Sequence, residues 1–519
     1  MKVGSPWPTR GTRRRPPVMT SVAALTAAVL LLLGACGGGS GGAGAGAGAK
    51  GTDPAATVTI GQILEPSTLD ITRGSGVAIA DVLQNNVYQG LLQRDDTGTI
   101  TPALASGYQV SPDGLTYTFT LRPGVRFHDG NPLTAADVVS SLTAVIAPGS
   151  TNPNAANLAS LASVASPDPG RVVLTLRHRD TNFTFWLTTA AGVILRRGAT
   201  DLAATANGTG PFRFASWRHG DSITLARNDG YWGARAGVAK VVFRYITDPN
   251  AQNNAVRTGQ VDIGAIADAD LINSYRGNPD FVVVRGTTTD KFTLGFNAAR
   301  APLSDERVRH ALRQGIDKDG LIKVLGTGVR IGGDVPPSDP WYEDLTGIDR
   351  YDPAHARALL AQSGHPRGLK LTLTVPTIYP TSIAEYVASQ LRQIGVEVTI
   401  RPVEFSTWLT DVFAHHDYDL SIVDHVEPRD LGNYALPAYY WGYDDPRTQA
   451  LYQTGVQASS DKDRDDSFRA VARRVSQQAV SDWLLLGESR QVARSGIRGY
   501  PANNTSQIYD ASKIVVTRS

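Results

Sequence analysis

Apolar and polar residues alternate along several short stretches of the chain, as they do in strands that bury one face. The stretches that predict strands are 57–64, 116–122, 172–176, 240–246, 292–296, 369–375 and 396–401. Elsewhere apolar residues recur every three or four positions, which predicts helices. The predicted helices are 78–89, a helix that Thr134 caps from residue 135, 250–259, 305–315, 353–363 and 382–393.

The order of these elements predicts an α/β fold with two lobes. Residues 369–401 run strand–helix–strand, which implies two parallel strands joined by a crossover helix. One set of elements begins near residue 57 and a second near residue 292, so each lobe is expected to have its own core. A cleft between two such lobes is a favoured place for a small ligand.

The first fifty residues have the layout of a secretory signal. Basic residues precede an apolar run over 18–33, and small residues precede Cys36. A positive region, an apolar region and small residues before a cleavage site are typical of a signal peptide, which is predicted here over 1–35. The apolar run is shorter than the ~20 residues that span a membrane.

Cys36 is the only cysteine of the chain, so no internal disulfide can form. Its place at the end of Leu33-Gly34-Ala35-Cys36 resembles the bacterial lipobox, in which the cysteine is diacylated and becomes the new N-terminus. That resemblance implies a lipid anchor on a membrane. Residues 36–56 are predicted to be the lipidated cysteine and a flexible tether, because Gly, Ala and Ser dominate this stretch.

Composition narrows the range of partners. The 519 residues carry a formal net charge of +2 with both signs interspersed, so nothing indicates nucleic acid or an acidic polymer as a partner. Charged residues make up only 19% of the chain, which is typical of a loop-rich protein. One cysteine and two methionines suit an oxidising compartment outside the cytoplasm.

Many short motifs occur in an order that identifies a family. They are Leu69-Asp70, 87–91, 101–105, 117–130, 136–138, 208–212, Tyr231-Trp232-Gly233, 259–263, Phe296-Asn297, 307–312, Ile316-Asp317 and Tyr351-Asp352-Pro353. Together they resemble family 5 of the extracellular solute-binding proteins, which includes periplasmic dipeptide-, oligopeptide- and nickel-binding proteins. The resemblance covers nearly everything from residue 57 to the end. Most of these motifs are expected to be structural; Arg307 and Arg309, for example, are predicted to pair with acids on the surface.

The resemblance implies a two-lobed clamshell fold of the periplasmic-binding-protein type, with an additional subdomain and discontinuous lobes. Lobe I would combine 57–84, 205–293 and 487–519; the subdomain would be 85–204 and lobe II 294–486. It also implies the substrate-binding lipoprotein of an ABC importer, which delivers a short peptide or similar solute to permease subunits. Such a protein is exported, anchored on the outer face of the cytoplasmic membrane, monomeric, and neither an enzyme nor dependent on a cofactor.

In peptide-binding members of the family, an acidic residue of the second lobe holds the free amine of the ligand. It follows a strand that opens with Tyr-Asp or Phe-Asp, and 418–423 match that strand. The usual aromatic segment is replaced by 424–430, where Glu427 lies nearest the expected position and Asp430 is second. The resemblance therefore implies that Glu427 or Asp430 recognises an amine, although the departure argues against a standard dipeptide specificity.

Other residues complete the predicted ligand site. Arg429 can hold a carboxylate bidentately, which a lysine cannot, and Tyr440 and Trp441 can form an aromatic wall. Glu65 and Ser67 follow the first strand, where family members lay backbone beside a bound peptide. The alternative is that 424–430 form a salt-bridged surface loop followed by ordinary aromatic packing.

Histidines and acids between 415 and 425 raise the possibility of a metal site, because imidazole and carboxylate suit nickel-like ions. His415 and His416 are adjacent and point apart, while Asp419 and Asp424 flank one strand, so a solvated helix end is favoured and no metal is predicted. Two other functions stay open. A cell-surface hydrolase of peptides or glycans would need a recognised triad or HExxH pattern, which the sequence lacks; a solute sensor or chaperone could use the same fold.

Overall fold

The computed structural model describes residues 51–74, 77–266 and 268–518. The predicted signal peptide, Cys36 and most of the predicted tether lie outside these residues. The last residues assigned to the tether are bonded to the C-terminal strand region: Thr52 pairs with Thr517, and the amide of Asp53 donates to the carbonyl of Val516 at 2.7 Å. Across the described ranges, every helix is too short or too polar to cross a membrane.

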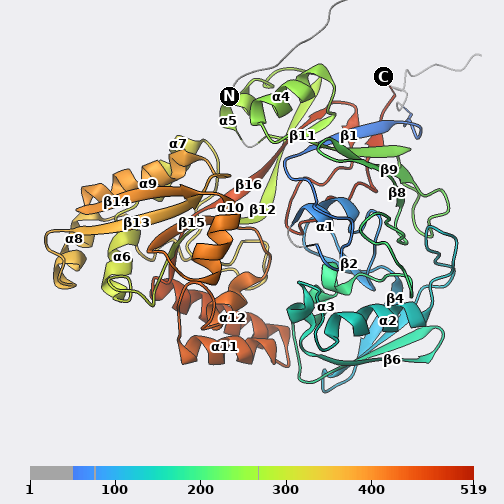
Figure 1. The fold of residues 1–519 in the computed structure, drawn as a ribbon, viewed down its shortest axis with the longest axis horizontal. Coiled ribbons are helices and arrows are strands. Elements are labelled where there is room, and N and C mark those ends of the chain that lie inside the picture. The colour runs from blue at the N-terminus through green and yellow to red at the C-terminus, as the bar shows by residue number, and fades with distance from the viewer. Residues whose placement is uncertain (1–50, 75–76, 267, 519) are drawn as a thin grey trace, which may run out of the picture. The chain divides into compact units, whose positions relative to one another are not determined.

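One mixed sheet of ten strands forms the backbone of the fold (Figure 1). Its strands are β1 (Thr57–Gln62), β8 (Phe212–Arg218), β9 (Ser222–Arg227), β10 (Lys240–Tyr245), β11 (Ile263–Ala265), β12 (Phe281–Phe296), β13 (Leu369–Pro376), β14 (Val396–Val403), β15 (Leu420–His425) and β16 (Ser481–Arg494). They lie in the order β14-β13-β15-β12-β16-β11-β1-β10-β9-β8. The predicted parallel pairing of β13 with β14 is confirmed, and β1 is parallel to both of its neighbours.

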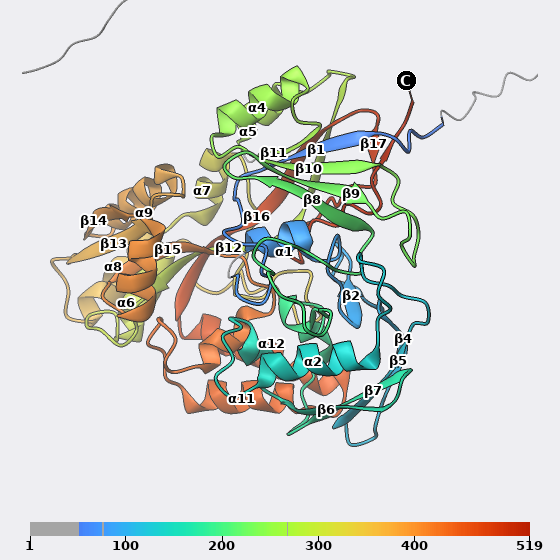
Figure 2. The ribbon, with the colours of Figure 1, turned by 45° about the vertical axis from the view of Figure 1, so that its right-hand side comes forward.

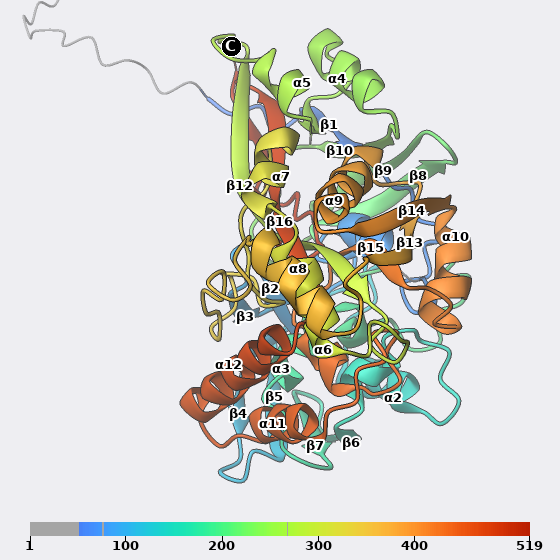
Figure 3. The same cartoon turned by 90° about the vertical axis from the view of Figure 1, so that its left-hand side faces the viewer.

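Two long antiparallel strands, β12 and β16, join the two ends of this sheet and run side by side in Figure 3. Only 292–296 of β12 was expected from alternation. The other parts lack a period of two: β16 contains the continuous run 483–486, which is buried throughout, as is typical of central strands. The pairing partner of such a run lies almost 200 residues away, so no local pattern announces it.

Helices α1 (Val77–Leu83), α4 (Pro249–Thr258) and α5 (Ala269–Asn273) accompany the strands around β1. Figure 2 shows α1 below β8, β9 and β10. Side chains from β1, α1, β9 and β10 share one buried apolar core. The predicted helix 78–89 is too long: α1 ends at Leu83, and Asn85 has a left-handed φ of 62° with its amide bonded to the carbonyl of Tyr88. A residue in that conformation cannot continue a helix.

A second sheet lies between α1 and β8 in the chain and has its own core. It has the order β4-β5-β7-β6 and is accompanied by a strand pair and short helices. The elements are β2 (Leu92–Arg94), β3 (Ile100–Pro102), β4 (Ala105–Val110), β5 (Thr116–Leu121), α2 (Ala135–Ile146), η1 (Ala155–Leu158), β6 (Leu161–Asp168), β7 (Arg171–Leu176), α3 (Phe183–Trp186) and η2 (Ala190–Gly192). The predicted cap of α2 is confirmed, since Asp137 accepts hydrogen bonds from the amide and hydroxyl of Thr134 at 2.8 and 2.6 Å.

The remaining helices lie between β12 and β16 in the chain, and several of them pack on β13, β14 and β15. They are α6 (Glu306–Gln314), α7 (Lys318–Leu325), α8 (Pro353–Gln362), α9 (Thr381–Gln393), α10 (Phe405–Trp408), η3 (Leu409–Ala414), η4 (Asp430–Ala435), α11 (Pro446–Val456) and α12 (Asp461–Gln477). Figure 1 shows α9 above these strands and α6 and α8 below them, and all of them share one core. A second, aromatic-rich core lies among α11, α12 and the segments that precede them. Two further strands, β17 (Ile497–Arg498) and β18 (Val515–Val516), pair near the C-terminus.

The expected surface pairing of the two arginines of α6 is correct for Arg307 only. Its guanidinium lies 2.6 Å from Asp305. Arg309 is 5% exposed and donates instead to the carbonyls of Leu303, Gln478 and Ala479. A buried guanidinium satisfies its fixed fork of donors on backbone oxygens, and this arginine therefore ties α6 to the turn after α12.

The predicted α/β class is confirmed. Separate apolar cores belong to the segments around β1, to 91–194 and to the segments between β12 and β16. The same sheet nevertheless continues through β12 and β16 from the first of these groups to the last. The division into lobe I, subdomain and lobe II at the predicted boundaries stays a prediction.

Candidate functional site

A cavity of about 590 Å³ opens where four parts of the chain meet. One wall comes from α1 and β2, a second from the segment 156–190, a third from 427–436 and α11, and a fourth from Ser506 and Gln507. These parts are far apart in sequence, so the cavity exists only in the folded chain. Its volume lies within the range of about 300–1,000 Å³ that is usual for small-molecule sites.

The segment that follows β15 carries the charged residues of the third wall. Backbone geometry sets their directions: Arg429 has a left-handed φ of 60° just before η4 begins at Asp430. The turn leaves Glu427 exposed, while Asp430 is buried. Glu427, Arg429 and Asp430 all line the cavity, so the structure brings these three predicted site residues together.

Asp430 is committed to a partner inside the protein. Its carboxylate lies 3.1 Å from the ammonium of Lys291, and both side chains are almost completely buried. Lys291 also donates to the carbonyls of Thr289 and Glu427 at 3.0 and 3.2 Å. A buried charge is stable only when it is paired and hydrogen-bonded, and this network supplies both conditions.

More acids than cations surround Lys291. Burial alone lowers its pKa, but Asp430, Asp334 and Glu427 outweigh that effect and raise the pKa above its ordinary value. Burial, against the effect of Lys291, raises the pKa of Asp290 to about 6. Burial and Asp290 raise the pKa of Asp424 well above its ordinary value. Glu427 and Asp430 thus give the cavity an acidic side, and further acids behind it surround the one ammonium of Lys291.

The basic side of the cavity is formed by Arg429 and Arg94. Arg429 donates to the side-chain oxygen of Asn182 at 2.9 Å, and its guanidinium lies over the rings of Phe185 and Trp341 at 4.1 and 4.9 Å. Burial lowers the pKa of Arg429 to about 10, although Asp339 acts in the opposite direction. Arginine at this pKa is still a cation at neutral pH.

Sequence reasoning missed Arg94, Phe185 and Lys291. Arg94 ends a strand of three residues and Phe185 belongs to a four-residue helix, so neither lies in a pattern that points to a ligand. Lys291 lies in the long strand β12 directly after Asp290, with Arg285 earlier in the same strand. A lysine beside an acid within a strand was the one local signal, because lysine is almost never fully buried unless it is paired.

Tyr440 and Trp441 lie behind the cavity rather than along it. They are 1% and 2% exposed, and their ring centroids are 4.1 Å apart. The hydroxyl of Tyr440 lies 2.8 Å from Nε2 of His425. Burial and Lys291 lower the pKa of His425 to about 3, which keeps the imidazole neutral. In this structure the two aromatics pack against the segment that carries Glu427 and Arg429 and do not line its cavity.

Glu65 and Ser67 also lie outside the cavity lining. The carboxylate of Glu65 accepts hydrogen bonds from the indole of Trp217 at 2.6 Å and from the amide of Gly220 at 3.0 Å. Ser67 is exposed. Glu65 thus fastens the end of β1 to the turn between β8 and β9, and the structure does not bring it together with Glu427.

Potential metal ligands occur at the same place, and two of the three are bonded within the protein. His425, Glu427 and Asp430 offer donor atoms within 4.8 Å of one another. His425 is bonded to Tyr440, and Asp430 is bonded to Lys291. The absence of a metal stays a prediction. Asp419, another candidate from the sequence, accepts from the amide of Thr372.

Comparison with known proteins identifies the family of this chain. Residues 99–461 match the family described as "Bacterial extracellular solute-binding proteins, family 5 Middle". The chain belongs to this family. The predicted family is thereby confirmed, and with it the description of the protein as an extracellular solute-binding protein.

Relatives of this solute-binding protein include the glutathione-binding protein GsiB of Pectobacterium atrosepticum, which is 28% identical over 338 residues. That match covers 63% of this chain and 65% of the relative's length. Protein XP55 of Streptomyces lividans is 30% identical over 460 residues, 83% of this chain and 82% of its own. The structure of periplasmic DppA from Helicobacter pylori in complex with the peptide STSA has a TM-score of 0.79 at 22% identity and covers 89% of this chain and 98% of its own. This likeness confirms the periplasmic-binding-protein fold.

Proposed function

We propose that this family 5 solute-binding protein captures a short peptide or similar small solute in its cavity and delivers it to the permease of an ABC importer. It acts as a monomer on the outer face of the cytoplasmic membrane, where a lipid on Cys36 anchors it. Family membership supports the solute-binding role. The names of the relatives support the ligand class, since one binds glutathione and one solved structure holds a four-residue peptide.

The observation that carries the ligand class is the pair of opposite charges at one wall of the cavity. Glu427 is exposed, and no ion pair of its carboxylate occurs among the residues that the structure describes. Arg429, two positions later, lines the same cavity and has one hydrogen bond, to Asn182. An amine and a carboxylate of a zwitterion would find opposite charges here, and such charge-assisted hydrogen bonds are the strong ones.

Within this wall, Glu427 is the group for the ligand's amine and Arg429 the group for its carboxylate. Asp430 takes a supporting role, because Lys291 already neutralises it. Tyr440 and Trp441 stiffen the segment from behind by aromatic packing, and Glu65 and Ser67 follow the end of β1.

Mass spectrometry of the protein purified without denaturation tests this function. We expect a bound small solute with both an amine and a carboxylate, released when the protein is unfolded with acid. The emptied and refolded protein should then bind the same compound in a calorimetric titration. If the purified protein carries nothing and the refolded protein ignores a mixture of di- to tetrapeptides, the proposed ligand class is wrong.

A further inference from the structure

Two arginines from distant parts of the chain converge on one phenylalanine at the cavity. The guanidinium of Arg94, at the end of β2, lies 4.2 Å from the ring centroid of Phe185, and that of Arg429 lies 4.1 Å from the same centroid. Arg94 is 4% exposed, and both arginines line the cavity. The contact of a cation with an aromatic face is favourable, and it fixes the position of each guanidinium.

Both guanidiniums have far fewer partners than their chemistry allows. Arg94 makes one hydrogen bond, from Nη2 to the carbonyl of Ser506 at 3.3 Å, and Arg429 makes the one to Asn182. The Nε atoms of both are buried without a partner, and neither arginine forms a salt bridge within the described part of the chain. A guanidinium has five donors, and buried polar groups in folded proteins are normally bonded.

Bringing two cations together in a buried place is unfavourable unless something anionic joins them. Burial and Arg429 lower the pKa of Arg94 to about 9, with Asp339 and Asp95 acting the other way. Asp339 lies close enough to affect both arginines but forms a salt bridge with neither. Asp339 thus offsets part of the positive charge of the two arginines from a distance, but within the described part of the chain no carboxylate is bonded to either guanidinium.

We infer that Arg94 and Arg429, positioned by Phe185, form the subsite for a carboxylate of the ligand. The inference rests on the proposed function for the ligand class but adds a residue from the 85–204 segment, opposite the wall that carries Glu427. The planar forks of the guanidiniums match carboxylate oxygens, and the unpaired donors are then satisfied. Because Arg94 and Arg429 come from different walls, a carboxylate bound here also joins those walls.

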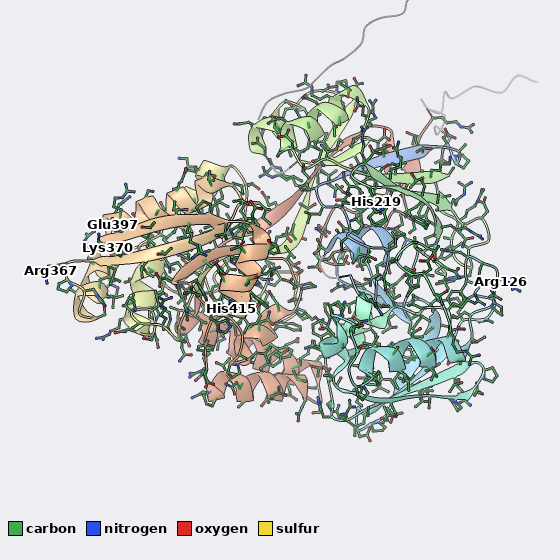
Figure 4. The ribbon with its side chains drawn as sticks, viewed as in Figure 1. Arg126, His219, Arg367, Lys370, Glu397 and His415 are labelled. Carbon is green, nitrogen blue, oxygen red and sulfur yellow. The ribbon has the colours of Figure 1, made fainter. Side chains whose placement is uncertain are left out.

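The test compares Arg94→Gln with the matched control Arg126→Gln. Arg126 belongs to the same segment, is exposed, bonds to the carbonyl of Gly130 and lies at the outer edge of the molecule in Figure 4. The probes are trialanine and its C-terminal amide, titrated by calorimetry. We expect Arg94→Gln to weaken the binding of trialanine at least tenfold and that of the amide less than threefold. Arg126→Gln should change neither.

A third probe separates two sources of the carboxylate. If Arg94→Gln instead weakens the binding of an amidated tripeptide with a central glutamate, the subsite takes an acidic side chain rather than the C-terminus. Equal binding of all three peptides by Arg94→Gln and the parent protein would overturn the subsite while leaving the transport role intact.

An additional measurement keeps the subsite testable when no peptide binds. Sodium acetate, compared with sodium chloride at the same ionic strength, should raise the melting temperature of the parent protein and of Arg126→Gln but not of Arg94→Gln. If Arg94→Gln does not fold, Arg94→Lys replaces it, because lysine keeps the positive charge but lacks the planar guanidinium. Acetate should raise the melting temperature of Arg94→Lys at most half as much as that of the parent protein. Acetate stabilisation without peptide binding would overturn the proposed ligand class alone; no acetate effect on the parent protein would overturn the subsite.

Discussion

Glu427 and Asp430 are three positions apart, yet their surroundings assign them opposite roles. Asp430 is buried against Lys291, whereas Glu427 is exposed on the cavity wall. Sequence reasoning predicted that this segment carries the polar recognition and ranked Glu427 first. It could not decide between the acids, because the partner that commits Asp430 comes from β12, more than 130 residues earlier.

Replacing Glu427 by Gln should weaken the binding of the copurified ligand at least tenfold. With ligand bound, the carboxylate of Glu427 and the ligand's amine form a buried pair, and loss of one partner of such a pair costs ~2–5 kcal/mol. The empty protein, in which Glu427 is exposed, should melt at nearly the same temperature. Glu397→Gln is the control, because Glu397 forms a surface pair with Lys370, both labelled in Figure 4. Calorimetric titration of the three proteins decides the matter, and a change under threefold in Glu427→Gln would show that Glu427 is structural.

Lys291→Met should destabilise the fold by about 3–5 kcal/mol, the usual effect of removing one partner of a buried pair. The loss should be larger at pH 8 than at pH 5. The pKa of Asp290 is raised to about 6, so its carboxyl is mostly protonated at pH 5. The stability that the protonated carboxyl contributes is lost as pH rises through this folded pKa. At pH 8 Asp290 is ionised, and without Lys291 no ammonium lies beside its charge.

Urea unfolding at the two pH values measures this effect. Lys370→Met is the control: Lys370 is 84% exposed in its side chain, and an exposed pair contributes ~1 kcal/mol or less. Equal losses in the two variants would mean that the acids around Lys291 do not need its charge.

Apart from 78–89, the helices that were predicted have nearly the observed bounds, because the signals that start and end them are local; α7, α11 and α12 were not predicted. Thr134 and Asp137 cap α2, and Asp305 and Gly315 bound α6, all from neighbouring residues. The strands β12 and β16 were largely missed for the opposite reason. They are defined by pairing with each other. In β16 the burial of consecutive residues also removes the alternation on which a strand prediction depends.

The contact between α11 and α12 should depend on pH through Asp445. This residue caps α11 at Thr448 and pairs with Arg474 of α12 at 2.6 and 2.8 Å. The hydrogen bonds from Arg474 lower the pKa of Asp445 below its ordinary value, against a smaller effect of burial. The stabilisation is thus present above the unfolded pKa of Asp, about 3.9, and is lost as pH falls through the folded pKa.

Asp445→Asn should accordingly reduce the free energy of unfolding by about 1–2 kcal/mol at pH 7, between the values for an exposed pair and for a buried charged hydrogen bond. The difference from the parent protein should shrink at pH 3. Urea unfolding at both pH values measures it, with Asp466→Asn, an exposed acid of α12, as the control. A difference that stays constant between the two pH values would contradict a role for the charge.

At the scale of the whole molecule, the family and the α/β class followed from motif order and alternation. The cavity did not, because its walls meet only after residues near 94, 185 and 429 have folded together. The same difference explains why Glu427 and Arg429 were anticipated while Arg94 and Phe185 were not. The sequence of one segment can resemble a known site, but the local sequence of two distant segments does not predict that they contact each other.

Cys36→Ser should abolish membrane retention and leave folding unchanged. Each buried methylene of an acyl chain contributes roughly 0.8 kcal/mol to membrane binding, and no second cysteine is present to carry a chain. Partitioning into a detergent phase measures the anchor, with Ser40→Ala in the predicted tether as the control. Retention of the serine variant in the detergent phase would show that the protein is held by some other means.

Thr181 bonds the segment before α3 to the end of α11, beside the cavity. The amide and hydroxyl of Thr181 donate to the carbonyls of Val456 and Gly455, at 2.8 and 3.0 Å, and the neighbouring Asn182 accepts from Arg429. These bonds join the segment before α3 to the end of α11 and to the wall that carries Glu427. Hinge closure around a ligand is a common way for a two-lobed protein to retain it. In this structure the two segments are already joined by these bonds.

Thr181→Val keeps the shape and removes one bond of this contact. A net hydrogen bond is worth about 0.5–1.5 kcal/mol, so the ligand should dissociate about 2- to 12-fold faster. The association rate should change little, because most effects of contact mutations fall on dissociation. Stopped-flow tryptophan fluorescence with the copurified ligand measures both rates. Thr258→Val, which removes only bonds to the carbonyls of Asn254 and Ala255 within α4, is the control. Unchanged dissociation in Thr181→Val would show that the contact forms equally with and without ligand and does not retain it.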